Sequence, residues 1–195
     1  NIAAGNPTIN FGSSSITLTG VGTVLSMGTG FTLNAGTSTI LVGDTSSSTK
    51  TFAGGGKTFY NVLIAMGGTG AITFSGNNTF NKLNKSGTGT KTIKFTDGST
   101  TTLTGGASAF FSGTAGNLIT VQNTTSTNYT VTSSTKLESW YISLSRCTGA
   151  GAGINHKVYN GTNAGNNSNW DFSTISTGLP HLGTRGLMRG IRSGV

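Results

Sequence analysis

A short pattern occurs twice near the middle of the chain, as TFYNV at residues 58–62 and, 21 residues later, as TFNKL at residues 79–83. Three further spacings lie close to this value, at 22, 21 and 20 residues: Phe52 to Phe74, Phe74 to Phe95, and Leu83 to Leu103. A repeat of nearly constant length indicates stacked units, each too small to bury its apolar residues alone. The sequence therefore predicts a repeat architecture.

The segments around this repeat consist of short runs in which apolar residues alternate with Thr or Ser, bounded by Gly, Asn or Ser. Such runs are typical of short β-strands. We expect strands at residues 16–18, 31–33, 40–42, 62–64, 72–74, 93–95, 118–121 and 141–144. Together with the repeat, they predict an all-β fold, a parallel β-helix or β-solenoid with coils of about 21 residues. An antiparallel β-sandwich with ordinary hairpins is the alternative.

The composition favours stacked coils. Of 195 residues, 32 are Gly and only 8% are charged, against roughly 25% in ordinary domains. Coils of a solenoid stack about 4.8 Å apart, so that like charges in neighbouring coils repel while stacked Thr, Ser and Asn form hydrogen bonds. A helical bundle and a collagen are excluded by the same composition. Since no run of 18 apolar residues occurs, we expect no membrane insertion.

A solenoid must protect the strands at its two ends from pairing with other chains. Aromatic residues gather near the end of the β-rich region, and we expect Trp140, Trp170 and Phe172 to pack over the last coil. Nothing comparable lies near Asn1, where we expect further upstream sequence or a partner. These features divide the chain into a β-solenoid domain at residues 1–172 and a tail at residues 173–195.

The tail combines apolar residues at helical spacing with basic residues beside them. They form a predicted partner-docking set: Arg185, Leu187, Met188, Arg189, Ile191 and Arg192. We expect this set to dock on a neighbouring protein subunit. A salt-sensitive contact with an anionic surface such as nucleic acid, and a tail without fixed structure, are the alternatives.

The residues that could support catalysis are few. The chain has four acids against 12 Lys and Arg, a formal net charge of +8. Glycan cleavage needs a pair of carboxylates, for which Asp44, Asp97 and Asp171 are the only plausible participants. No nucleophile-elbow motif occurs. We therefore expect a protein that is not an enzyme, with glycan cleavage as a less favoured alternative.

Ligands for a metal or cofactor are equally scarce. His156, His181 and Cys147 lie in different contexts, whereas a structural zinc site needs about four such ligands. The segment GGGKT at residues 54–58 ends like a phosphate-binding loop, but Thr51 stands where that motif needs Gly, and a strand follows where it needs a helix. We expect a turn there, and no cofactor or metal. Four tyrosines could stack on sugar rings, although core or cap packing is the stronger expectation for each: Tyr60, Tyr129, Tyr141 and Tyr159.

The segments ISLSR at residues 142–146 and GNNSNWDF at residues 165–172 resemble the closing motif of repeat-rich proteins of tailed phages and prophages, with Asn169 in place of the usual Gly. The resemblance extends from about Phe52 to Phe172. It implies a virion structural protein with a β-helix-like domain, of the tail spike, fibre, baseplate or capsid-decoration type. Such proteins assemble with other virion proteins and are often trimeric homo-oligomers. It supplies no catalytic residues.

These observations together predict a rigid structural component of an extracellular phage particle. The uncharged Thr- and Asn-rich faces would contact neighbouring subunits, with a host-surface glycan as a further partner, and nucleic acid is not an expected partner. A secreted bacterial adhesin or surface-layer fragment is the alternative.

Overall fold

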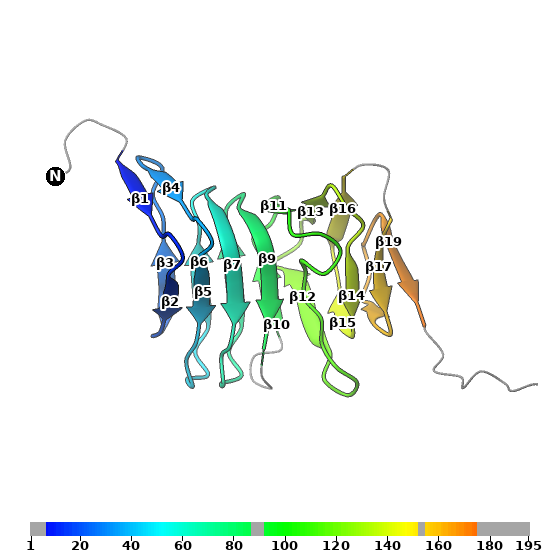
Figure 1. The fold of residues 1–195 in the computed structure, drawn as a ribbon. Helices are drawn as coiled ribbons and strands as arrows, with labels where there is room; N and C mark the ends of the chain where they lie inside the picture. The colour runs from blue at the N-terminus through cyan, green and yellow to red at the C-terminus, as the bar shows by residue number, and fades with distance from the viewer. Residues whose placement is uncertain (1–6, 87–91, 152–154, 175–195) are drawn as a thin grey trace, which may run out of the picture.

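The chain is an all-β parallel solenoid. A computed structural model describes residues 7–86, 92–151 and 155–174, and within these ranges it contains strands and no helix. The solenoid has about seven turns of about 22 residues each, and Figure 1 shows the strands succeeding one another along a single axis. The sandwich alternative is therefore wrong, because every pair of neighbouring strands runs parallel rather than antiparallel.

Two long sheets form most of the walls. The first sheet contains seven strands, in spatial order β18 (Thr162–Asn163), β15 (Ile142–Leu144), β12 (Ile119–Asn123), β10 (Thr92–Phe95), β8 (Ile72–Ser75), β6 (Lys50–Ala53) and β3 (Gly22–Ser26). The second sheet also contains seven, β16 (Cys147–Ala150), β13 (Tyr129–Ser133), β11 (Thr100–Leu103), β9 (Thr79–Lys85), β7 (Thr58–Ile64), β5 (Thr39–Val42) and β2 (Ser15–Leu18). Two small sheets complete the walls: β1 (Thr8–Asn10) with β4 (Thr32–Asn34), and β14 (Glu138–Trp140) with β17 (His156–Tyr159) and β19 (Trp170–Ser173).

The repeat in the sequence corresponds to the register of the coils. β7 and β9 pair so that Thr58 lies opposite Thr79 and Phe59 opposite Phe80. The spacings of Phe52, Phe74 and Phe95 are likewise confirmed, because each residue pairs with the next. The regular pattern thus arises because equivalent positions of successive coils lie directly above one another.

The pairing inferred for Leu83 and Leu103 is wrong. Leu103 lies opposite Phe80, and the backbone N–H of Leu83 donates to the carbonyl oxygen of Ala109 at 2.9 Å. The cause is a long connection between β11 and β12, residues 104–118, which inserts Phe110 and Phe111 into the core. Because this loop lengthens one coil, the constant spacing ends there.

Phenylalanine side chains run through the interior as a continuous stack. The ring of Phe74 lies 5.3 Å from that of Phe52 and 5.6 Å from that of Phe95, centroid to centroid. It also meets Phe80 edge-on at 5.8 Å. All four side chains are fully buried, so this stack links successive coils by apolar packing as well as by backbone hydrogen bonds.

The glycine-rich segment 54–57 is a turn between β6 and β7, as the sequence predicted, and not a phosphate-binding loop. Gly55 has a φ of +62°, and a Cβ there would lie 2.1 Å from the carbonyl oxygen of Met27. The buried Asn78 of the next coil holds the turn: its Oδ1 accepts from the N–H of Gly56 at 3.1 Å, and its Nδ2 donates to the carbonyl oxygen of Ser75 at 2.9 Å. The turn therefore serves the stacking of coils.

Residues 165–169 cover the outer edge of β16, the last strand of the second sheet. Asn167 accepts from the N–H of Cys147 at 2.9 Å and donates to the carbonyl oxygen of Leu144 at 2.7 Å. Asn169 donates to the carbonyl oxygen of Gly149 at 2.8 Å. Asn169 has a φ of +59°, a conformation that Asn tolerates better than most residues. The asparagines of this segment thus satisfy backbone groups that the final coil would otherwise leave unpaired.

Candidate functional site

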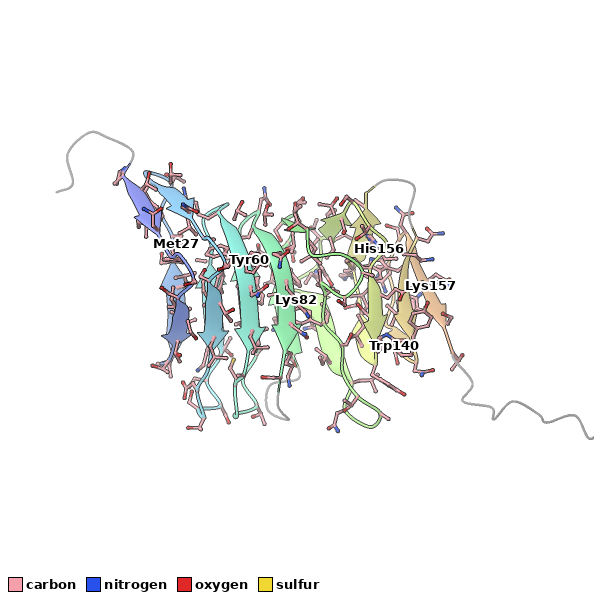
Figure 2. The ribbon with its side chains drawn as sticks, in the orientation of Figure 1. Met27, Tyr60, Lys82, Trp140, His156 and Lys157 are labelled. Atoms are coloured by element: carbon pink, nitrogen blue, oxygen red, sulfur yellow. The ribbon has the colours of Figure 1, made fainter. Side chains whose placement is uncertain are left out.

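Two adjoining hollows on the outer surface of β7 and β9 form the candidate binding site. The larger measures about 380 Å³ and is lined by Leu33, Asn34, Ala35, Gly36, Thr58, Phe59, Tyr60, Asn81 and Thr104. The smaller measures about 210 Å³ and is lined by Thr39, Asn61, Val62, Leu63, Lys82 and Asn84. Figure 2 labels Tyr60 on β7 and Lys82 on β9, which are neighbouring strands of the second sheet.

The register of β7 and β9 explains why polar groups meet at this place. Asn61 lies opposite Lys82, so that Asn81 is its diagonal neighbour, and Asn81 Nδ2 donates to Asn61 Oδ1 at 3.1 Å. Residues of β4 and the turn after it, from Leu33 to Gly36, complete the larger hollow from an earlier coil.

The chemistry of the lining is that of a binding surface. It offers amides, hydroxyls, the phenol ring of Tyr60 and the ammonium group of Lys82, and no carboxylate lines either hollow. Amides can both donate and accept hydrogen bonds, as the hydroxyl groups of a sugar require, and an aromatic ring adds an apolar surface. The hollows can therefore bind a polyhydroxylated ligand, whereas they hold no pair of acids for proton transfer.

The four tyrosines have different environments. Tyr60 is half-buried at the larger hollow. Tyr129 is fully buried and stacks on Phe95 with ring centroids 4.9 Å apart, so it is a core residue that cannot reach a sugar. Tyr159 stacks on Trp140 at 4.5 Å, and Tyr141 Oη accepts from Asn160 Nδ2 at 3.4 Å. Only Tyr60 belongs to the lining of a hollow.

The aromatic residues expected over the last coil lie in the last small sheet. Trp170 and Phe172 of β19 are partly buried against the core, with the Trp170 ring 4.9 Å from the ring of His156. Trp140 lies on β14 opposite Tyr159 of β17. These positions show what the three side chains contact, while their role as a cap stays a prediction.

The structure does not bring Asp44, Asp97 and Asp171 together. Asp44 lies in a corner that leads from the second sheet to the first, between β5 and β6, and Asp97 in a corner that leads from the first to the second, between β10 and β11. Asp171 is on β19, where it lies 3.7 Å from Lys157 Nζ and is half-exposed. We infer that the three acids act separately and structurally.

Asp97 organises the loop at residues 124–127. Its carboxylate accepts from the side-chain hydroxyl of Thr125 and from the backbone N–H groups of Thr127, Thr125 and Ser126, at 3.0, 3.0 and 2.9 Å for the three backbone donors. These hydrogen bonds hold the pKa of Asp97 well below its usual range, with the Thr125 hydroxyl as the largest cause. The charge of Asp97 therefore stabilises this loop.

This arrangement predicts a loss of stability in acid. Because the pKa is lower in the folded chain than in the unfolded chain, where it is about 3.9, the stabilisation is present above that value and disappears as the pH falls below it. In Asp97→Asn the free energy of unfolding should decline less between pH 5 and pH 2, with Thr125→Val intermediate, as measured by urea unfolding at each pH. Equal slopes for all three proteins would show that Asp97 does not anchor the loop.

Cys147 and His156 are buried structural groups. Burial raises the pKa of the Cys147 thiol to about 12, so the thiol stays protonated and is a poor nucleophile and metal ligand. His156 Nδ1 accepts from the N–H of Leu137 at 3.2 Å, so that Nε2 carries the proton and faces the carbonyl oxygen of Ala150, also at 3.2 Å. Burial lowers the pKa of His156. Across residues 7–86, 92–151 and 155–174 no group of three or more metal-ligating side chains occurs.

The predicted partner-docking set, from Arg185 to Ile191 and Arg192, lies outside the described residues, as does His181. Its role, and the boundary between domain and tail at residue 172, stay predictions. In the part of the chain that the structure describes, no helix has the length and apolar character needed to span a membrane.

By its architecture the chain belongs to the class of parallel β-solenoids, with a polar hollow on one wall. Comparisons with protein-family models, with curated proteins and with solved structures found no match.

Proposed function

We propose that this chain is a structural component of a tailed-phage particle, placed in the tail as part of a fibre, spike or baseplate, or decorating the capsid. It would mediate assembly with other virion proteins, as a homo-oligomer, and attachment to a host surface. The observation that carries the proposal is the continuous parallel stacking of two seven-stranded sheets around one stack of phenylalanines. The closing segment at residues 165–172, which resembles that of phage proteins, supports the same proposal.

The mechanism is mechanical and adhesive. Hydrogen bonds between successive strands run along the solenoid axis, so a force along this axis is distributed over many bonds in parallel strands. The tail at residues 173–195 would attach the rod to its neighbour. No step of this mechanism needs a cofactor or a bond-breaking residue.

Immunogold electron microscopy tests the location. An antibody against this chain should label phage-like particles from the source at the tail tip, the fibres or the shell, and the labelled place would decide between tail and capsid. Gold on intact cell surfaces, with accessible particles unlabelled, would overturn the phage proposal in favour of a bacterial adhesin.

The hollows on β7 and β9 are the proposed contact with a host-surface glycan, neutral or acidic. Tyr60→Ala should lower the affinity for an oligosaccharide selected on an array of such glycans about tenfold, the equivalent of about 1.4 kcal/mol. Binding is measured by calorimetry with the selected sugar. Tyr159→Ala is the matched control, because Tyr159 lies on the other small face against Trp140. Loss of binding in the control with normal binding in Tyr60→Ala would show that the hollow is not the site.

A further inference from the structure

The two ends of the second sheet are built differently. At one end residues 165–169 cover β16, with the N–H of Gly149 donating to the carbonyl oxygen of Ser168 at 2.8 Å. At the other end β2 is the outermost strand, and among the described residues no strand pairs with its outer edge. Figure 1 shows β2 and β3 together at the blue end of the solenoid.

The apolar residues of this first coil are incompletely covered. Those that contact the core but remain partly exposed include Phe11, Ile16, Leu18, Val24 and Leu25. Their counterparts one coil later are fully buried, as in Ile40, which pairs with Ile16, and Val42, which pairs with Leu18. The first coil therefore presents apolar side chains that a further layer of strand would bury.

The hydrogen-bonding groups that β2 leaves open can be assigned from its ladder with β5. The carbonyl oxygens of Ser14 and Leu18 accept from the N–H groups of Thr39 and Gly43, at 2.9 and 3.0 Å. Because backbone groups alternate in direction along a parallel strand, the N–H and C=O groups of Ser15 and Thr17 point away from β5. They form an unpaired edge on the outside of the coil.

This edge has none of the devices that prevent pairing. Proteins block open edges with charges, proline or bulges. The sequence has no Asp, Glu, Lys or Arg before Asp44, and β2 contains no proline. The neighbouring β3 has an irregular register between Thr23 and Leu25 where it pairs with β6, whereas β2 pairs with β5 in unbroken register. Among these end strands, β2 is thus the regular, uncharged one.

The distribution of charge indicates a second copy of the chain as the occupant. The formal net charge of +8 comes from residues after position 43, so two copies can approach through their first coils while the charged residues of both remain apart and screened. An edge that is neutral and carries the same groups in both copies is self-complementary across a two-fold axis. The basic tail of another copy fits less well, because the first coil offers its arginines no acid.

We propose that β2 pairs antiparallel with β2 of a second copy across a two-fold axis, so that two solenoids join end to end. Ser15 of one copy then lies opposite Thr17 of the other, and their open N–H and C=O groups pair. The two Ile16 side chains meet at the axis and are removed from water. This pairing does not depend on the proposed place of the protein in a phage particle.

Light scattering coupled to size-exclusion chromatography tests the pairing on the full chain. The native chain should elute with twice the mass of one 19.7 kDa chain. Thr17→Pro removes one open N–H without touching the bonds to β5, and it should give the single-chain mass at the same concentration, with unchanged circular dichroism. Thr17→Val, which keeps the N–H and the branched shape of an exposed residue, should remain dimeric.

Thr17→Lys provides a second route should the proline variant fold poorly. It keeps every backbone group and places like charges near each other in the dimer, so it should also give the single-chain mass. A native chain that is monomeric at all concentrations overturns the proposal. So does a trimer, or a dimer that persists in Thr17→Lys, since such assemblies would form through another surface.

Discussion

Replacing Phe74 by alanine should lower the free energy of unfolding by about 3–5 kcal/mol, the cost of removing a large buried ring from a packed core. The Phe74 side chain is fully buried and contacts the rings of Phe52, Phe80 and Phe95, which belong to three different coils. The void would therefore interrupt the packing between coils in the middle of the solenoid. Urea unfolding followed by circular dichroism measures the change.

Thr73→Ala is the matched control for this substitution. Thr73 is the neighbour of Phe74 in β8 but points to the outer face, where it is only partly buried. Its replacement should cost about 0.5–1 kcal/mol. A similar cost for the two variants would mean that the phenylalanine stack does not hold the coils together.

The register of the middle coils was predictable because stacking leaves a direct record in the sequence. Phe59 and Phe80 lie above one another, and the same inward position selects the same residue type. The repeat length follows from this identity without knowledge of the fold. Beyond Leu103 the record stops, because the long loop with Phe110 and Phe111 supplies core residues from outside the strands.

The hollow was only partly predictable. Tyr60 could be singled out as an aromatic residue in a polar segment, but it has no signal that connects it with Asn34, which belongs to an earlier coil. That neighbourhood depends on how β4 and its turn pass over β7, a consequence of three-dimensional packing. The asparagines at positions 167 and 169 were found as a motif, while their bonds to the backbone of the last coil needed the structure.

Lys50 is the residue whose environment the sequence indicated least, because lysines are rarely buried without a partner. It occupies an inward position of β6, opposite Ile72 of the next coil. Its side chain is 0% exposed, and Nζ donates to Asp44 Oδ2 at 2.8 Å and to Ser46 Oγ at 3.0 Å. These bonds hold the pKa of Asp44 well below its usual range, with the bond from Lys50 as the largest cause. The corner between β5 and β6 is thus closed by a charge that enters the core.

Lys50→Ala should therefore be strongly destabilising, with a loss of about 2–5 kcal/mol from the void left by the buried stem. It also leaves Asp44 without its cation. Lys50→Met is the control for volume, because methionine fills a similar space without charge and should recover part of the loss.

Adding Asp44→Asn to Lys50→Met should recover more, since replacement of both partners of a buried ion pair is tolerated better than removal of one. Urea unfolding of the four proteins at pH 7 gives the order native chain, double variant, Lys50→Met, Lys50→Ala, with the double variant near the native chain. If Lys50→Ala costs less than about 1 kcal/mol, the value of an ordinary surface substitution, Lys50 lies outside the core and the corner closes by other contacts.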